Sequence, residues 1–187
     1  MAATIIPLAT RRPEPLPGNA IRSKRLKLQD FPAEDEHMQR IYACWHAALH
    51  LHCGMPTRKD VDLFDHLDLF KPSMGYLHII DCDTDDPANY SFRLYGSGIQ
   101  IFQSKNFTHS RLSDIPCLTY RQEIMADYHT VRESGTPSLH VIKTRLDWYT
   151  TTYSRLVLPL SQNRRDVTQL LVAVHRRPVP ELGDLPW

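Results

Sequence analysis

The chain has 187 residues, which is enough for one domain with a tail and would be cramped for two. A formal net charge of +1 with 23% charged residues excludes a strong overall attraction to nucleic acid or to an anionic membrane. No apolar run approaches the ~20 residues that span a bilayer, and the four scattered cysteines form no Cys-x-x-Cys pair. We therefore expect a cytoplasmic protein with reduced thiols and no membrane insertion.

Residues 1–29 differ in composition from the rest of the chain. They contain four prolines and six basic side chains against a single acid, and their apolar residues recur at no helix or strand period. Such a stretch buries too little apolar surface to offset the entropy lost on ordering, so we expect a flexible basic arm. The arm is either a solvated tail or a local patch that touches an acidic partner or nucleic acid. The domain itself is expected at residues 30–178, followed by a tail at residues 179–187.

An amphipathic helix is predicted over residues 33–52. Its apolar residues fall at spacings of 3, 1, 3 and 4, which places them on one helical face, and Gly54 and Pro56 end the helix. This apolar stripe consists of Met38, Ile41, Tyr42, Trp45 and Leu49. The stripe is expected to cover either the sheet of its own chain or a second copy of the chain, which would give a homodimer.

The apolar period then changes from helical to strand-like. A short second helix is predicted over residues 60–70, where the leucines share one face. Residues 76–81 and 90–95 read as strands on either side of a polar turn. That turn is too short for a crossover connection, so the two strands should form an antiparallel hairpin.

A longer helix and three strands complete the predicted domain. The helix covers residues 118–134 and is ended by Gly135 and Pro137. Strand-like runs follow at residues 139–148, 151–160 and 167–176. The order of elements predicts an α+β domain built on a five-stranded antiparallel sheet, with helices on one face and the N-terminal helix flanking it.

Six motifs follow one another across about 130 residues. They are residues 56–62 (Pro-Thr-Arg-Lys-Asp-Val-Asp), Asp81 at a strand end, residues 90–97 (Tyr-Ser-Phe-Arg-Leu-Tyr-Gly-Ser), residues 108–114 (Thr-His-Ser-Arg-Leu-Ser-Asp), residues 135–137 (Gly-Thr-Pro) and residues 158–160 (Leu-Pro-Leu). In this order the motifs resemble the PAS sensor superfamily, and more narrowly a group of stand-alone PAS-like proteins of alphaproteobacteria. Two positions depart from that group, since Leu63 stands in place of a proline and His109 in place of a glycine.

The resemblance implies a PAS-like sheet that encloses a pocket for a small ligand. It also implies a signalling protein that acts by contact with a regulatory protein such as a histidine kinase. In PAS folds the pocket lies between the sheet and the helices that follow the second strand. By strand and helix alternation, the expected lining is Phe92, Leu94, Ile99, Phe102, Ile124, Tyr128, Leu156 and Leu158. The same residues could simply fill a core. Arg93 is expected on the opposite face, paired with Asp81.

The histidines suggest an alternative function, a metal- or haem-dependent sensor or enzyme. His46 and His50 are four residues apart on a helix, so both imidazoles could reach one ion, with Cys53 one turn further along. No third ligand has a clear role, and partly exposed helix histidines are the simpler account. His129 lies on the long helix, where some PAS proteins hold haem, but helical projection places it about 100° from Tyr128. The identity of any cofactor stays open.

Patterns for covalent catalysis are lacking in the sequence. Ser97 lies between Gly96 and Gly98, but the nucleophile elbow Gly-x-Ser-x-Gly needs a different spacing. With only seven glycines the chain contains no glycine-rich phosphate loop. We therefore expect a binding and signalling protein rather than an enzyme.

Overall fold

The computed structural model describes residue 18 and residues 20–62, 65–98, 106–146 and 149–177. These residues form a six-stranded sheet in the order β1-β4-β5-β6-β2-β3, with every neighbouring pair antiparallel. The strands are β1 (Ala20–Leu26), β2 (Leu77–Asp81), β3 (Ser91–Tyr95), β4 (Ser138–Leu146), β5 (Tyr149–Ser161) and β6 (Val167–Arg177). The α-helices are α1 (Glu36–His52), α2 (Leu67–Phe70) and α3 (Leu118–Ser134), and 3-10 turns cover Ala33–Asp35, Lys71–Ser73, Pro87–Asn89 and Leu112–Asp114.

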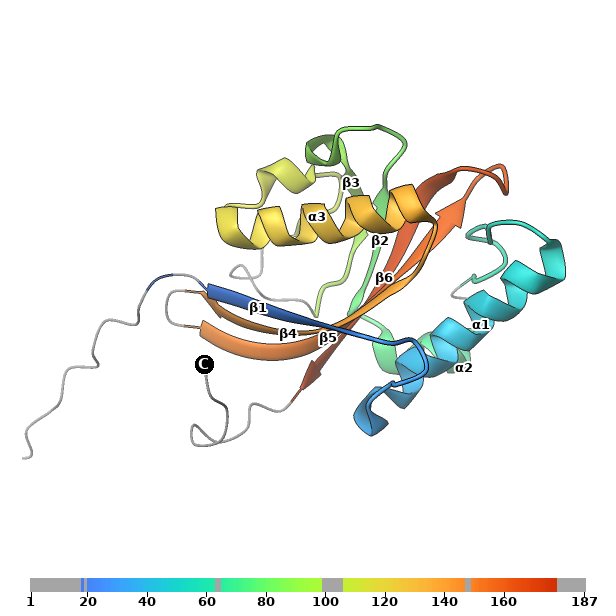
Figure 1. The fold of residues 1–187 in the computed structure, drawn as a ribbon, viewed down its shortest axis with the longest axis horizontal. Coiled ribbons are helices and arrows are strands. Elements are labelled where there is room, and N and C mark those ends of the chain that lie inside the picture. Colours follow the sequence, from blue (N-terminus) through green and yellow to red (C-terminus); the bar gives the residue numbers. More distant parts are fainter. Residues whose placement is uncertain (1–17, 19, 63–64, 99–105, 147–148, 178–187) are drawn as a thin grey trace, which may run out of the picture.

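Helices cover both faces of the sheet. Figure 1 shows α3 on one face and α1 with α2 on the other. The buried side chains divide in the same way into two clusters. The α3-side core includes Tyr90, Phe92, Ile124, Tyr128, Val157 and Val172. The α1-side core includes Met38, Trp45, Phe70, Leu156, Leu158 and Leu171.

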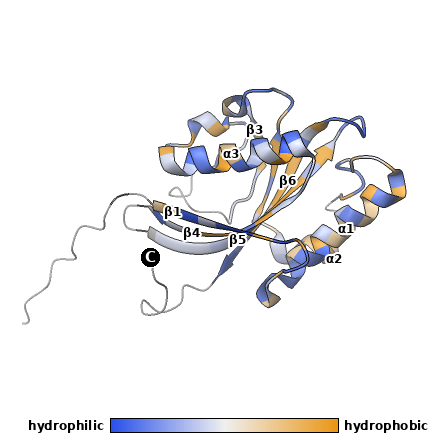
Figure 2. Ribbon diagram, in the orientation of Figure 1, coloured by the Kyte–Doolittle hydropathy of each residue, from blue (hydrophilic) through white to orange (hydrophobic). Residues whose placement is uncertain are grey.

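The predicted α+β class, the antiparallel sheet and the flanking N-terminal helix are confirmed by this arrangement. Figure 2 shows the strongly hydrophobic residues on the part of the strands that lies between α3 and α1, whereas β1 is largely hydrophilic. None of the helices in the described part of the chain has both the length and the apolar character needed to cross a bilayer.

Strand β1 corrects the predicted organisation of the N-terminal segment. Residues 20–26 were expected in the flexible arm, but they pair along their whole length with β4, so the sheet has six strands rather than five. Only Ile21 and Leu26 pack against the two cores, while residues 22–25 are exposed. Two apolar residues produce no readable period. The strand is instead ordered by backbone hydrogen bonds to the edge of β4, a contribution that composition cannot reveal.

The two long helices lie where periodicity predicts them. Helix α3 has the predicted bounds and ends at Gly135, whose φ of 60° lies in the left-handed region that glycine adopts without strain. Helix α1 ends instead at Cys53, which has the left-handed φ of 49°. In the described residues the second predicted helix is confined to α2. Asp60 does not begin a helix there. It closes a turn with Thr57, whose backbone N–H and hydroxyl both donate to Asp60 Oδ2.

The apolar stripe of α1 packs against the sheet of its own chain. Met38, Ile41 and Trp45 are buried in the α1-side core, and Tyr42 and Leu49 pack at its border. This is the first of the two arrangements that the stripe predicted. A homodimer remains a prediction.

Trp45 also connects α1 to the sheet by a hydrogen bond. Its indole N–H donates to the carbonyl of Pro159 at 2.7 Å. Strand β4 begins at Ser138, opposite Val157, so Pro159 lies beyond the end of β4, where one side of β5 is open. A proline is tolerated there because no strand needs its missing N–H, and the indole takes up a carbonyl that would otherwise lack a partner.

A β-bulge in β3 separates side chains that simple alternation places together. Ile79 pairs with Leu94 whereas Ile80 pairs with Phe92, which leaves Arg93 as the extra residue. Phe92 therefore lies in the α3-side core, while Leu94 lines the opposite face beside Ile79. The expectation that Phe92 and Leu94 share a face is wrong because the bulge shifts the period of two by one residue.

Candidate functional site

A buried arginine attaches α3 to the sheet. Arg155 of β5 is 1% exposed. Its two terminal amino groups donate to both carboxylate oxygens of Glu123 at 3.1 and 3.0 Å, and one of them also donates to Oδ2 of Asp127 at 2.8 Å. The two acids are four residues apart on α3 and so project from the same helical face. We call these three residues the arginine bridge.

The arginine bridge is electrostatically matched. Burial acts to lower the pKa of Arg155, but the attraction of Asp127 and Glu123 outweighs it and holds that pKa well above its ordinary value. The guanidinium also lies over the ring of Tyr128, 5.5 Å from its centroid. The Nε–H of Arg155 has no hydrogen-bond partner among the described residues. A buried donor left without a partner is costly, which makes this cluster a candidate for function.

Asp127 is held ionised by its neighbours. Burial acts to raise its pKa, but Arg155, His140 and a hydrogen bond donated by the Ser138 hydroxyl at 2.9 Å outweigh it and lower the pKa to about 2. His140 Nδ1 lies 3.4 Å from the same carboxylate. Asp127 and Arg155 are therefore both charged throughout the neutral pH range.

Acid is expected to weaken the fold through Asp127. The folded pKa of about 2 lies below the ordinary value of 3.8, so the unfolded chain binds more protons in that interval. The stabilisation is present above pH 4 and is lost as the pH falls through 2, up to roughly 2 kcal/mol for a shift of this size. We expect the free energy of unfolding, measured by urea denaturation, to fall more steeply between pH 5 and 2 in the native chain than in Asp127→Asn. Equal slopes would contradict this assignment.

A small cavity lies beneath α3, next to the arginine bridge. Its volume is about 10 Å³, which is room for about one water molecule. The walls are mostly aromatic, and they are formed by His78, Phe92, Tyr95, Phe107, Ile115, Tyr120, Ile124 and Tyr128. Four of these lining residues, His78, Tyr95, Tyr120 and Tyr128, also carry a polar group.

His78 is one of the strongly perturbed groups at this cavity. Complete burial, followed by the repulsion of Arg155, lowers its pKa to about 3, so the ring is neutral. Its Nδ1 accepts a hydrogen bond from the backbone N–H of Gly96 at 3.3 Å, and the ring proton therefore resides on Nε2. Burial also raises the pKa of Tyr120 and holds that of Tyr128 well above its usual value, so both hydroxyls stay protonated donors.

The structure divides the predicted pocket residues between the two faces of the sheet. Phe92, Ile124 and Tyr128 line the cavity beneath α3, as expected. Leu156 and Leu158 lie instead in the α1-side core, and Leu94 lines a separate cavity on that face. Ile99 and Phe102 lie outside the described residues. Strand β5 is buried on both faces from Tyr153 to Ser161, so alternation shows that Leu156 and Leu158 share a face without showing which one.

The arginine bridge and His78 were not singled out from the sequence. Arg155 interrupts the run Tyr-Ser-Arg-Leu-Val-Leu of a strand that is otherwise buried, which is a readable signal for a paired charge. Glu123 and Asp127 each precede an inward-facing residue of α3, Ile124 and Tyr128, but helix periodicity treats them as surface positions.

The predicted ion pair between Arg93 and Asp81 is confirmed. Arg93 Nε donates to Asp81 Oδ1 at 2.9 Å, and Gln169 donates to the same oxygen at 2.7 Å. These bonds hold Arg93 on the face of the sheet opposite to α3, as expected. Its guanidinium is thereby fixed beside Leu94.

The candidate metal ligands lie together on the outer side of α1. The Nε2 atoms of His46 and His50 are 3.2 Å apart, and the thiol of Cys53 donates to the backbone carbonyl of His50 at 3.8 Å. His52 contacts Asp60 instead, at 3.1 Å. Among the described residues no three His, Cys, Asp or Glu side chains gather in a way that could hold a metal ion. Metal binding by His46 and His50 stays a prediction.

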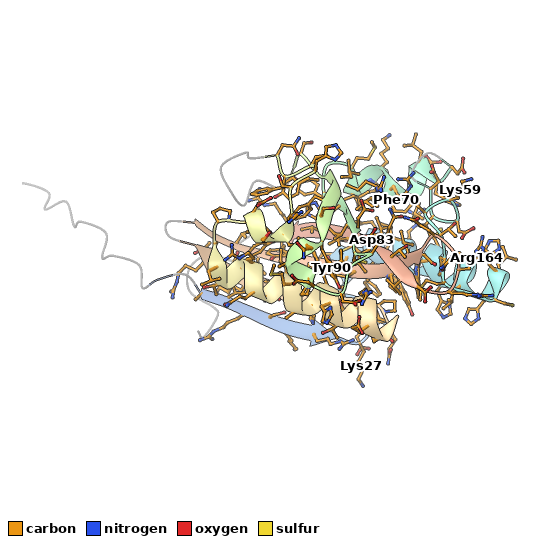
Figure 3. The ribbon with its side chains drawn as sticks, turned by 90° about the horizontal axis from the view of Figure 1, so that it is seen from above. Lys27, Lys59, Phe70, Asp83, Tyr90 and Arg164 are labelled. Atoms are coloured by element: carbon orange, nitrogen blue, oxygen red, sulfur yellow. The ribbon has the colours of Figure 1, made fainter. Side chains whose placement is uncertain are left out.

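The haem candidate His129 lies at the border of the α3-side core. Its Nδ1 is 3.0 Å from the hydroxyl of Tyr90, and Figure 3 shows Tyr90 beside α3. The ring is half-buried in this contact and does not line the cavity beneath α3. The geometry therefore adds no support to the haem alternative.

The described residues thus combine a buried charged bridge with a small, mostly aromatic cavity on the same face of the sheet. Comparison of the chain with protein-family models, with curated proteins and with solved structures gave no significant match.

Proposed function

We propose that this protein is a PAS-like signalling module that acts by contact with a second protein and has no catalytic activity. Strand β1 is an addition at one edge of the sheet. Of the other five strands, two precede α3 and three follow it, in an arrangement compatible with the PAS resemblance. The observation that carries the proposal is the arginine bridge, because it joins α3 to the sheet directly beside the cavity.

The bridge makes the position of α3 sensitive to what lies beneath it. The cavity has room for about one water molecule, so any larger ligand must displace residues of its wall. Three of these, Tyr120, Ile124 and Tyr128, belong to α3, and we propose that they move. Such a displacement changes the geometry of three charge-assisted hydrogen bonds in a buried setting, where they are strongest. Ligand binding and the position of α3 are then coupled by the difference in affinity between the two arrangements.

The outer face of α3 is where a partner would detect this change. Only one of its exposed positions is charged, Glu133. These positions are Leu118, Thr119, Gln122, Ala126, Thr130, Glu133 and Ser134. The resemblance implies that the partner is a regulatory protein such as a histidine kinase.

The partner surface can be tested with a photo-crosslinking amino acid placed at Gln122 in living cells. A discrete protein adduct is expected from this position, and none from the matched exposed position Arg40 on α1. A folded protein that forms no adduct from Gln122 would contradict the α3 surface.

The ligand is tested separately, by mass spectrometry of small molecules released from the natively purified protein. We expect one compound in stoichiometric amount whose addition alters hydrogen exchange in α3. If the protein is purified without a ligand and no added compound changes hydrogen exchange in α3, then control by a small ligand is excluded. Only the proposed contact with a partner protein would remain.

A further inference from the structure

A second and larger cavity lies on the opposite face of the sheet. Its volume is about 330 Å³, at the lower end of the range found for small-molecule sites. Its apolar wall is formed by Val61 from the loop after α1 and by one residue from each of four strands, namely Ile79, Leu94, Leu160 and Leu171. Its polar lining consists of Arg58, Asp62 and Arg93.

The bulge in β3 creates one side of this cavity. Because Arg93 is the extra residue at the bulge, Leu94 turns away from the α3-side core and Arg93 lies beside it. Leu94 is 39% exposed, so part of its side chain is accessible to a ligand. Bulges often redirect a side chain next to a binding site. Here the bulge places an apolar surface and a cation side by side.

The loop that carries Arg58 and Asp62 is held by hydrogen bonds to the β5–β6 hairpin and to the end of β5. Asp60 accepts two hydrogen bonds from the guanidinium of Arg164, both at 3.0 Å, and this joins the loop to the hairpin between β5 and β6. The backbone N–H of Ser161 donates to the carbonyl of Pro56 at 2.8 Å. Figure 3 shows Lys59 and Arg164 at the same end of the molecule. The rim of the cavity is therefore held in place before any ligand binds, which lowers the entropic cost of binding.

The two arginines retain donors for a ligand. Arg58 is exposed and makes no hydrogen bond or ion pair within the described part of the chain. Arg93 donates from Nε to Asp81, which orients its guanidinium. The lining thus carries two positive charges and the single negative charge of Asp62. A guanidinium fork matches the geometry of a carboxylate better than an ammonium group does.

We propose that this cavity binds a small amphipathic monocarboxylate. The carboxylate lies against Arg58 and Arg93, and its apolar body lies on the aliphatic wall formed by Leu94, Ile79 and Leu171. Arg93 is already paired with Asp81, so Arg58 supplies the positive charge that remains for a ligand. This suits a single negative charge, and Asp62 repels a second one. This site is separate from the cavity beneath α3, and it stands whether or not that cavity binds a ligand.

The proposal is tested by calorimetric titration of the full chain with octanoate, octanol and octyl phosphate. Octanoate is expected to bind at one site per chain, and octanol at least tenfold more weakly because it lacks the charge. Octyl phosphate should also bind more weakly, since it approaches a dianion and faces Asp62. Equal binding of octanol, tighter binding of octyl phosphate, or no saturable binding of octanoate would each overturn the proposal.

Three variants locate the site. Arg58→Gln should weaken octanoate binding by about 10- to 100-fold, the range for loss of a hydrogen bond to a charged group. Leu94→Glu should abolish it, because a carboxylate would then occupy the apolar wall. Lys59→Gln, an exposed neighbour that does not line the cavity, should leave the affinity within twofold. Circular dichroism checks that each variant is folded, and unchanged binding in folded Arg58→Gln and Leu94→Glu would place the ligand elsewhere.

Discussion

Arg155→Met is expected to lower the free energy of unfolding by about 3–5 kcal/mol, the range for removing one partner of a buried ion pair. Methionine keeps most of the side-chain length, so the cost is electrostatic rather than a cavity. The change leaves Glu123 and Asp127 facing the sheet without their cation, and the side chain of Asp127 is only 7% exposed. Urea denaturation followed by circular dichroism measures the loss.

Two matched variants separate the charge effect from packing. Glu123→Gln should cost far less than Arg155→Met, because the side chain of Glu123 is 21% exposed and Asp127 still pairs with the arginine. In the double variant Arg155→Met with Asp127→Leu, much of the stability should return, since burying apolar side chains in place of a whole ion pair is often neutral or stabilising. If the double variant were as unstable as the two single losses added together, the bridge would not be the source of the cost.

Trp45→Ala is expected to cost about 3–5 kcal/mol, the range for truncating a buried large aromatic residue. Trp45 is 2% exposed and lies at the centre of the α1-side core. Truncation removes its contacts with the sheet and also leaves the carbonyl of Pro159 without the donor it has at 2.7 Å. We expect the midpoint of urea denaturation to fall accordingly, and α1 to lose protection from hydrogen exchange before the sheet does.

The hydrogen bond and the packing of Trp45 can be measured apart. Trp45→Phe keeps an aromatic ring but removes the N–H, so it should cost clearly less than the alanine change, about 1–3 kcal/mol for an unsatisfied buried carbonyl and a partly filled site. Leu51→Ala on the same helix is the control, because Leu51 is 77% exposed and should change stability by less than about 0.5 kcal/mol. If Trp45→Ala and Leu51→Ala lowered the free energy of unfolding by similar amounts, the apolar stripe would not be what attaches α1 to the sheet.

Both predictions concern residues that attach a helix to the sheet, and only one of them could be found from the sequence. Trp45 stands in an apolar stripe at helical spacing, and the structure buries that stripe as the spacing predicts. Arg155 stands in a buried strand where the pattern predicts apolar residues, and its partners lie 28 and 32 residues away in the chain. Pairing over such a separation leaves no periodic trace in either segment.

Of the two cavities, the sequence predicted part of the lining of one and gave no sign of the other. Periodicity placed Phe92, Ile124 and Tyr128 on the face of the sheet beneath α3, where they line the small cavity. The larger cavity depends on the bulge at Arg93 and on a loop anchored by Asp60 to Arg164. A bulge is a one-residue change in strand pairing, which depends on the partner strand as much as on the residues of β3.

The sequence by itself determined the elements whose formation depends on local spacing and turn chemistry. These are the helix α3 with its glycine end, the stripe of α1, the hairpin of β2 and β3, and the closing strands. Each rests on side chains three or four residues apart in a helix, or two apart in a strand, which any chain segment displays on its own.

Only the tertiary structure decided which face each strand presents and what completes the sheet. Strand β1 has almost no apolar pattern and is ordered by pairing with β4, and β5 is buried on both sides, so its alternation cannot tell one face from the other. The arginine bridge, the bulge and both cavities likewise depend on contacts between distant segments. Local periodicity predicts which residues are buried. The segments that bury them are distant in the chain, so these contacts depend on the whole fold.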